Sequence, residues 1–434
     1  MADTSLSPRP SPWLPALEDA RERYARIRPR SAEAFRRAGV VLPGGSTRSV
    51  LDVAPFPFRV VSAAGGELTD VDGHTCIDLL GDYSAGLLGH DPGPIAAAVN
   101  AALERGWAYG GVHLDEIRLA ETVVDRFPSI EQVRFTNSGT EANLMAVQLA
   151  RHHTGRDRIV VMDHAYHGGL LYFGSGGGPL LAPFAFTRVA FNDPDAARAI
   201  TGDVAAVLVE PMMGAAGCIP AEPEFLAGLR EATERAGALL IFDEVMTSRM
   251  GWGGAQARIG VTPDLTTLGK YLAGGMTFGA FGGRADVMAA FDPARPGALS
   301  HGGTFNNNVV TMAAGVAAAE LLDAATLDRH FDRGERFRAR VAEVLAASGL
   351  PLSVTGMGSL ASVHATAGPV TTPSRRVTTA DPVLAELVYH ELLAHGVYLA
   401  PRGYYALSLA LDDDQLDRAL AALTAAVAAV AAAA

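Results

Sequence analysis

The chain has 434 residues, of which 49% are apolar and 19% are charged, a composition typical of a folded globular protein with a large core. Its net charge of −12 argues against nucleic-acid binding, which usually requires a basic surface. Because Cys76 and Cys218 are the only cysteines, we exclude a disulfide framework and expect a cytoplasmic location. The N-terminus lacks the apolar segment of a signal peptide.

The first part of the chain predicts a helix, a loop and a hairpin. Residues 15–40 are rich in charged and helix-forming residues and indicate one helix, and a Pro-Gly-Gly loop that carries Arg48 follows. Two β-rich runs then flank Asp72 and Gly73, a dipeptide typical of hairpin turns. We assign residues 1–84, an N-terminal arm with this helix and hairpin, to part of a small domain.

From about residue 115, short apolar strands alternate with helices. This pattern predicts an α/β fold with a doubly wound, mostly parallel sheet, in a large domain over residues 85–324. The strands that we expect are QVRFTN, RIVVMD, AAVLVEP, ALLIFDEV, LTTLGK and FGAFGG. Residues 325–434 predict a smaller α+β domain that the N-terminal hairpin joins. The alanine-rich C-terminal run is shorter than the roughly 20 residues of a membrane span, so we expect a helix that packs on this domain and no membrane association.

A single lysine stands among the basic residues: 34 of the 35 are arginine, and the other is Lys270. Arginine serves ion pairs and anion recognition at least as well as lysine, but it cannot lose a proton near neutral pH and act as a nucleophile. Either this lysine is a remnant of compositional drift, or an amine is required at this position. In the second case other reactive groups should surround it.

Acidic residues follow two of the apolar strands, at the edge of a doubly wound sheet where ligands bind. Asp243 ends one strand, and a carboxylate there needs a cationic partner or hydrogen-bond donors. A protonated pyridine nitrogen would be such a partner, although the aspartate could instead cap the next helix. Glu210 ends another strand and could position a ring or a neighbouring side chain. Lys270 ends a third.

Phosphate donors are expected at the start of a helix. Ser138, Gly139 and Thr140 lie between a strand and a helix, where backbone amides, hydroxyls and the helix dipole favour phosphate. Ser138 and Glu141 also have the spacing of an ordinary capping box. Thr304 lies in a polar, glycine-rich loop and is a further candidate phosphate donor.

An aromatic residue completes this set of groups. Tyr166, followed by His167, lies in the loop after a strand, where its ring could stack on a planar ligand. An amine, a strand-end aspartate, a stacking ring and phosphate donors are together what pyridoxal 5′-phosphate requires. A lysine forms the Schiff base, and an aspartate keeps the pyridine nitrogen protonated so that the ring accepts electrons. No metal is expected.

The chain resembles the class III aminotransferases, which are pyridoxal-phosphate enzymes of fold type I. The resemblance spans roughly residues 40–320 and continues more weakly to the end. It is carried by SGTEANLMA, YHGG, LVEPMMGAAGCIP, FDEVMTSR, TTLGKYLAGGMTFGAFGGR and GGTFNNNVVTMAAG. It implies that Lys270 is the Schiff-base lysine, that Asp243 is the partner of the pyridine nitrogen and that Tyr166 stacks on the ring.

The same resemblance implies the rest of the cofactor site. Val245 would lie against the other face of the ring, and Ser138, Gly139 and Thr140 would hold the phosphate. Thr304 would join them from the partner subunit of a homodimer. The expected cofactor-binding residues also include His167, Glu210 and Met246.

Two branches of the family compete. VLPGGSTRSV, DEVMT and LGKYLAGGMTFGAFGGR resemble the glutamate-1-semialdehyde 2,1-aminomutases. GGSTRSVLDVAPFPFRV with GVYLAPRGYYALSL resembles the aromatic β-amino acid aminotransferases, those acting on (S)-β-phenylalanine in particular. In the second branch Arg48 would hold a substrate carboxylate, and Arg402 would meet the second carboxylate of the acceptor. An aminomutase would lack Arg402.

We therefore expect an aminotransferase that moves an amino group from a β-amino acid to a keto-acid acceptor, 2-oxoglutarate or pyruvate. Arg402, between Pro401 and Gly403, would swing toward a dicarboxylic acceptor and away from an apolar donor. The alternative for Arg402 is a surface arginine in a turn. The alternatives for the protein are an aminomutase, which needs no acceptor, and a class III amine transaminase with another donor range.

Overall fold

The computed structural model describes residues 11–174 and 178–433; the first ten residues, in the expected N-terminal arm, lie outside the described part. The α-helices are α1 (Leu14–Ile27), α2 (Pro29–Val41), α3 (Gly93–Arg105), α4 (Leu114–Arg126), α5 (Gly139–Thr154), α6 (Pro223–Ala236), α7 (Gly254–Ile259), α8 (Ala285–Met288), α9 (Val309–Glu320), α10 (Ala324–Ala347), α11 (Pro373–Thr379), α12 (Pro382–Ala394) and α13 (Asp413–Ala432). The strands are β1 (Val60–Ala64), β2 (Glu67–Asp70), β3 (Thr75–Asp78), β4 (Gln132–Thr136), β5 (Arg158–Met162), β6 (Ala185–Val189), β7 (Val204–Val209), β8 (Met212–Met213), β9 (Ile219–Pro220), β10 (Leu239–Asp243), β11 (Leu265–Gly269), β12 (Gly279–Gly283), β13 (Ser353–Met357), β14 (Leu360–His364), β15 (Val397–Tyr398) and β16 (Tyr404–Ala406).

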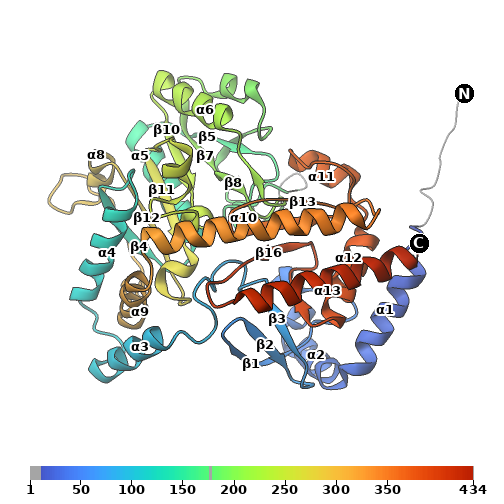
Figure 1. The fold of residues 1–434 in the computed structure, drawn as a ribbon. Coiled ribbons are helices and arrows are strands. Elements are labelled where there is room, and N and C mark those ends of the chain that lie inside the picture. The colour runs from blue at the N-terminus through green and yellow to red at the C-terminus, as the bar shows by residue number, and fades with distance from the viewer. Residues whose placement is uncertain (1–10, 175–177, 434) are drawn as a thin grey trace, which may run out of the picture.

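A seven-stranded sheet in the order β4-β12-β11-β10-β7-β5-β6 carries the predicted site residues at its strand ends (Figure 1). Its strands run parallel except β12, which is antiparallel to both neighbours, so the predicted mostly parallel sheet is confirmed. Strands β7, β10 and β11 are buried along their whole length, which explains their continuous apolar sequences. The edge strand β6 was not predicted, because it is only partly buried and has no continuous apolar run.

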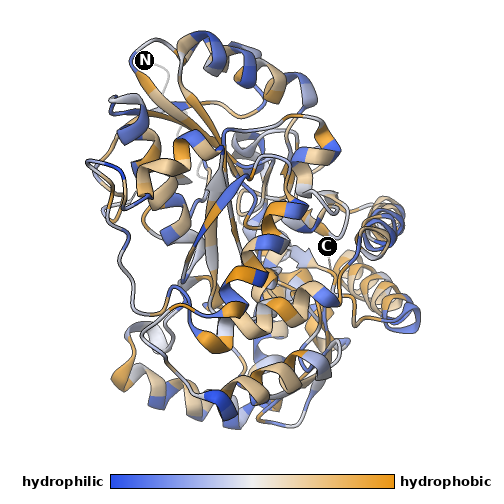
Figure 2. Ribbon diagram, turned by 90° about the vertical axis from the view of Figure 1, so that its left-hand side faces the viewer, coloured by the Kyte–Doolittle hydropathy of each residue, from blue (hydrophilic) through white to orange (hydrophobic). Residues whose placement is uncertain are grey.

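Helices cover this sheet, and α5 contacts five of its strands. Figure 2 shows helices that carry both hydrophilic and hydrophobic residues, as expected where one face is buried and the other meets solvent. A short connection leads from β4 into α5, and tight turns follow β10 and β11. The first residues of α5 and of these two turns therefore lie at one edge of the sheet. Residues of these strands are buried in two hydrophobic cores, which hold the strand ends in place.

Both ends of the chain contribute to a second assembly. The hairpin β2-β3 forms as predicted, and β15 pairs with β3 in parallel, so the predicted packing of the hairpin with the C-terminal part is confirmed. A three-stranded sheet, β13-β14-β16, lies beside it. Residues of α1, α10, α12 and α13 share one hydrophobic core. Domain boundaries at residues 84 and 324 stay a prediction.

The single helix predicted over residues 15–40 is wrong, because α1 and α2 are separate. Arg28 lies between them with φ −124° and ψ 51°, and Pro29 starts α2. A proline disfavours helical backbone at the residue before it, which ends α1. The buried guanidinium of Arg28 pairs with Asp70 at 3.0 Å and so fixes the break against β2.

The C-terminal helix α13 is longer than the sequence suggested. The side chain of Asp412 accepts a hydrogen bond from the Gln415 amide in a capping box, so the helix begins upstream of the alanine-rich run and has 20 residues. By length and composition it could cross a membrane, but 44% of its most apolar window is buried against the rest of the chain. It contacts α10 and α12, which confirms the predicted packing.

Candidate active site

Lys270 lies directly after β11, at the edge of the large sheet. Its backbone has φ 57°, in the left-handed region, and its amine Nζ donates a hydrogen bond to the carbonyl of Tyr83 at 2.8 Å. The residue keeps partial solvent access, yet the atoms packed around its amine lower its pKa to about 8, against an opposing effect of the Asp82 carboxylate. The amine can therefore exchange a proton at mildly alkaline pH.

The carboxylate of Asp243, at the end of β10, is buried and bound from three segments. Its Oδ1 accepts from the amide of Val245 at 3.0 Å, and its Oδ2 lies 2.8 Å from both Nδ2 of Asn143 and Nδ1 of His167. The next helical turn begins only at Thr247, so the alternative that Asp243 caps a helix is wrong. The hydrogen bonds hold the carboxylate in one orientation.

Asn143 is a site residue that sequence analysis missed. It lies on the buried face of α5, donates to the carbonyl of His167 at 3.1 Å and accepts from the hydroxyl of Thr267 at 2.7 Å. Its amide orientation is therefore set by groups on two other segments. The available signal was a buried polar residue within the helix that starts at Gly139.

The predicted phosphate-binding residues lie at the start of α5. Ser138 is the N-cap, and its hydroxyl accepts from the amide of Glu141 at 3.2 Å. A Cβ on Gly139 would come within 2.9 Å of a Val245 methyl, so only glycine allows Val245 this close. The hydroxyl of Thr140 accepts from the amide of Gly169 at 3.4 Å. The structure thus brings this turn and Val245 together.

Glu210 holds two backbone segments, the loop at Tyr166 and the turn at Gly214. Its carboxylate accepts from the amides of Tyr166 at 3.1 Å and Gly214 at 2.9 Å. Burial raises the pKa of Glu210 to about 7. His167 opposes this shift, and the carboxylate of Asp243 adds to it. A Cβ on Gly214 would lie 2.2 Å from the sulfur of Met246, which packs over this turn. The ring of Tyr166 remains half-exposed.

The loop before α3 supplies the acceptor for the lysine, and sequence analysis missed it. Asp82, Tyr83 and Ser84 all have positive φ, at 44°, 54° and 75°, which is costly for residues other than glycine. The buried carboxylate of Asp78 holds the loop through the amides of Leu80 and Gly81. Left-handed backbone at non-glycine residues has no strong signature in a sequence, so this contact could not be predicted.

The two predicted substrate arginines both lie near the ring of the same tyrosine. The guanidinium carbons of Arg48 and Arg402 are 5.2 Å and 5.3 Å from the centre of the Tyr83 ring. Arg48 also pairs with Asp82 at 2.6 Å. The Tyr83 ring stacks on Tyr404 at 5.8 Å. Both cations therefore lie next to the residue that binds the lysine amine.

The backbone around Arg402 is fixed rather than free. The amide of Gly403 donates to Ala400 at 2.8 Å, and its carbonyl accepts from Val363 at 2.9 Å. A Cβ on Gly403 would lie 2.0 Å from the Val363 carbonyl, so this turn is in close contact with β14. Movement of Arg402 must therefore come from its side chain, and not from a flexible Pro401–Gly403 turn.

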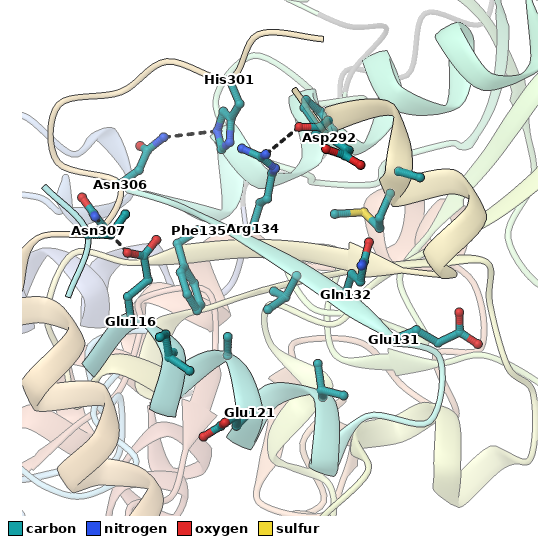
Figure 3. A pocket seen from close by; sticks show the side chains of 18 of the residues that line it. Glu116, Glu121, Glu131, Gln132, Arg134, Phe135, Asp292, His301, Asn306 and Asn307 are labelled. Carbon is teal, nitrogen blue, oxygen red and sulfur yellow. Dashed lines mark hydrogen bonds between the residues drawn. The ribbon is translucent and has the colours of Figure 1, made fainter. Parts of the chain in front are cut away.

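Thr304 does not join the other predicted residues within one chain. It is exposed in the loop between η7 (Ala289–Phe291) and α9. In the same loop, Asn306 accepts a hydrogen bond from Asn137 at 2.9 Å, one residue before the predicted phosphate-binding turn. A cavity of about 970 Å³ also lies here rather than at Lys270, and is lined by α4, β4 and this loop (Figure 3).

Comparison with known proteins shows the family of the chain. Residues 50–178 and 188–427 match the family model "Aminotransferase class-III", and the chain belongs to that family. It is 48% identical to the beta-phenylalanine transaminase of Variovorax paradoxus over 413 residues, which cover 94% of this chain and 95% of the relative. The crystal structure of the β-phenylalanine aminotransferase from Variovorax paradoxus superposes with a TM-score of 0.92 at 47% identity, covering 94% and 96% of the two chains.

A second branch of the family is also related. The glutamate-1-semialdehyde 2,1-aminomutase of Nitratidesulfovibrio vulgaris is 39% identical over 411 residues, which cover 89% of this chain and 96% of the relative. The chain is thus a pyridoxal-phosphate-dependent aminotransferase of fold type I, as the sequence predicted. The donor set at the sheet edge fits that cofactor, because it combines a single amine, a buried carboxylate, amides at the start of a 16-residue helix and an exposed aromatic ring.

The lowered pKa of Lys270 gives a direct test in the cofactor-free protein. Burial disfavours the ammonium form, so the reactive neutral amine should appear at a lower pH than in free lysine, whose pKa is about 10.4. We expect methylation of Lys270 by formaldehyde and cyanoborohydride to reach half its maximal rate near pH 8. Peptide mapping separates this residue from the N-terminal amine. A half-maximum above pH 10 would contradict the proposed burial.

Proposed function

We propose that this aminotransferase takes the amino group from a β-amino acid, an aromatic one such as β-phenylalanine, and gives it to 2-oxoglutarate or pyruvate. The observation that carries the proposal is the placement of Arg48 and Arg402 around Tyr83, whose carbonyl binds Lys270. Two separate cations beside one reactive amine suit substrates with one or two carboxylates. The identity with a β-phenylalanine transaminase supports the same assignment.

The cofactor would be held by the groups at the sheet edge. Lys270 would carry it covalently, and Asp243 would face its pyridine nitrogen. Tyr166 and Val245 would lie against the two faces of its ring, and the turn at residues 138–140 would bind its phosphate. When bound, pyridoxal 5′-phosphate supplies an electron sink for the substrate carbon that carries the amino group.

The protein's own groups would then move the proton and set the charges. Lys270, with a pKa of about 8, can accept a proton at Nζ and return it. Asn143 and His167 keep the Asp243 carboxylate in place, so it does not have to reorganise during the reaction. Glu210 holds the amide of Tyr166 and thereby the position of the stacking ring.

Charge explains how one pocket would serve two unlike substrates. Arg48 would bind the carboxylate of the donor, because a guanidinium offers a bidentate fork to a carboxylate. Arg402 would bind the second carboxylate of a dicarboxylic acceptor. With an apolar donor it would stay against Tyr83 and Tyr404, whose rings lie 5.3 Å and 5.8 Å from its guanidinium carbon.

The aminomutase alternative is less well supported. That activity transfers nitrogen within one substrate and does not require a second carboxylate-binding group. The position of Arg402, 5.3 Å from the Tyr83 ring, supports an enzyme with a separate acceptor, and the aminomutase relative is the less similar of the two.

We also propose that the protein is a homodimer and acts in the cytoplasm. Exposed apolar side chains gather beside the loop that carries Thr304, and His113 binds the carbonyl of Asn307 at 2.8 Å across the two segments. These side chains, the 107–117 surface, are Trp107, Tyr109, Val112, Leu114, Ile117 and Phe305. Several exposed apolar side chains in one region are typical of a protein interface. Both cysteines are buried and free, which fits a reducing compartment.

The cavity in Figure 3 supports a second copy of the chain as the occupant of this face. Glu116, Arg134, His301, Asn306 and Asn307 surround it. Hydrogen bonds join Asn307 to Glu116 at 3.0 Å and Asn306 to His301 at 3.2 Å. The cavity adjoins the phosphate-binding turn, so a partner here could bring its own Thr304 to the cofactor.

Replacing the two arginines tests the substrate assignment. Arg402→Ala should raise KM for 2-oxoglutarate roughly ten- to hundredfold and leave pyruvate nearly unchanged, because only the former has a second carboxylate. Arg48→Ala should weaken β-phenylalanine far more than a simple amine donor. Initial rates over a range of each substrate measure both effects.

The same assays show which result rules out each part of the assignment. If Arg402→Ala weakens both acceptors equally, Arg402 is structural. If the wild-type enzyme converts glutamate-1-semialdehyde without any acceptor and ignores β-amino acids, the aminomutase function replaces the proposed one.

The dimer predicts a measured mass of twice 45.2 kDa in sedimentation experiments. Val112→Asp places a charge on the 107–117 surface and should give monomers with weakened cofactor binding, because the partner's phosphate donor is lost. Val377→Asp, at another exposed valine, serves as the control and should stay dimeric. A monomeric wild type that retains the cofactor would contradict this proposal.

A further inference from the structure

A second cavity of about 590 Å³ meets the candidate active site at Arg402. Its walls come from β14, from α11 and the start of α12, from the loop at residues 52–54 and from the turn that carries Arg402. The proposed cofactor site does not use this space. Its chemistry is set by Arg376 and His364, which come from α11 and β14.

Two arginines, Arg376 and Arg402, line this cavity. Within the described residues, neither guanidinium group makes an ion pair or a hydrogen bond. Burial lowers the pKa of Arg376, and the charge of Arg402 lowers it further. The side chain of Arg376 also lies close enough to Cys218 and Tyr172 for their ionisation to affect it. Tyr172 contacts Tyr166 with ring centres 5.7 Å apart, so Arg376 borders the active site.

His364 adds a buried polar atom with no partner. Its Nε2 lies 2.6 Å from the Thr355 hydroxyl, which also donates to the Gly217 carbonyl at 2.7 Å. Its Nδ1 is buried and has no hydrogen-bond partner in the described part of the chain. Burial lowers the His364 pKa to about 4, so the ring is neutral at physiological pH and adds no positive charge to the cavity. Because the Thr355 hydroxyl donates its proton to Gly217, the ring proton lies on Nε2 and the unpaired Nδ1 is an acceptor.

Gly217 shows that these groups converge. A Cβ at this position would lie 2.7 Å from Cε1 of His364 and 2.8 Å from Cδ of Arg376. Its φ of 122° also disfavours other residues. The backbone of Gly217 thus lets the imidazole edge and the arginine side chain approach the same point.

The carboxylates that line the cavity do not neutralise the two arginines. Asp381 accepts from the amides at the start of α12, and Glu386 is paired with Arg21 at 2.6 Å. Asp52 is exposed. The groups that shift the pKa of Arg376 include no carboxylate. An anion from solution is therefore the ligand that this end of the cavity fits best.

We propose that Arg376, together with Arg402, binds the distal carboxylate of a dicarboxylic amino acceptor, so that Arg376 determines acceptor specificity. The inference rests on the proposed function for the identity of the ligand. A carboxylate between the two guanidinium groups removes their repulsion and accepts hydrogen bonds from both. A monocarboxylic acceptor leaves both cations unpaired and gains none of these interactions.

The first test uses acceptor kinetics. Arg376→Gln should raise KM for 2-oxoglutarate roughly tenfold or more and change KM for pyruvate little. Arg376→Lys keeps the charge and should restore part of the loss. Arg375→Gln removes a charge from the neighbouring exposed position on α11 and should leave both acceptors unchanged. Equal effects of Arg376→Gln on both acceptors would overturn the proposal.

A binding measurement separates this inference from the proposed function. Glutarate, a dicarboxylate that cannot be transaminated, should bind the wild-type holoenzyme more tightly than butyrate in calorimetry. Arg376→Gln should remove most of that preference, whereas Arg375→Gln should keep it. Equal glutarate affinity in wild type and Arg376→Gln would refute the subsite even if β-phenylalanine is transaminated. If β-amino acids are not substrates, the proposed function fails and the glutarate result still decides the subsite.

Discussion

The rest of the site depends on the hydrogen bonds made by the buried carboxylate of Asp243. An ionised carboxylate at the end of a buried strand is costly unless several donors surround it. Here the donors come from α5, from the loop after β5 and from the turn after β10, through Asn143, His167 and the Val245 amide. Satisfying one charge therefore fixes three segments, including the helix whose first turn would bind phosphate and the valine that packs on it.

The second constraint is the contact between Lys270 and the carbonyl of Tyr83. It joins the end of β11 to a loop with three successive left-handed residues, and that loop is held by Asp78. The ring of Tyr83 in turn lies beside Arg48 and Arg402. The amine and the two arginines thus all contact one residue, Tyr83. Their positive charges also add to the effect of burial in lowering the lysine pKa.

The sequence predicted those parts of the fold and site that depend on local patterns. Continuous apolar runs identified β7, β10 and β11, and residues at their ends, Asp243 and Lys270, lie at one edge of the sheet. What it missed depends on contacts between distant segments. Asn143 is not distinguished in the sequence, because its hydrogen bonds go to His167 and Asp243, which are distant in the chain. Arg376 likewise becomes a candidate only because it lines a cavity together with Arg402 and His364. The helix break at Pro29 was visible in the sequence and was overlooked.

The most direct test of this account is the single-turnover rate of Asp243→Asn with β-phenylalanine, measured on enzyme that has been shown spectroscopically to hold its cofactor. An asparagine keeps the size of the side chain but cannot stabilise a protonated pyridine nitrogen by charge. The account predicts a folded, cofactor-loaded protein whose rate falls roughly hundredfold or more. A rate near that of the wild type would show that the Asp243 carboxylate only organises the surrounding segments and does not act on the cofactor.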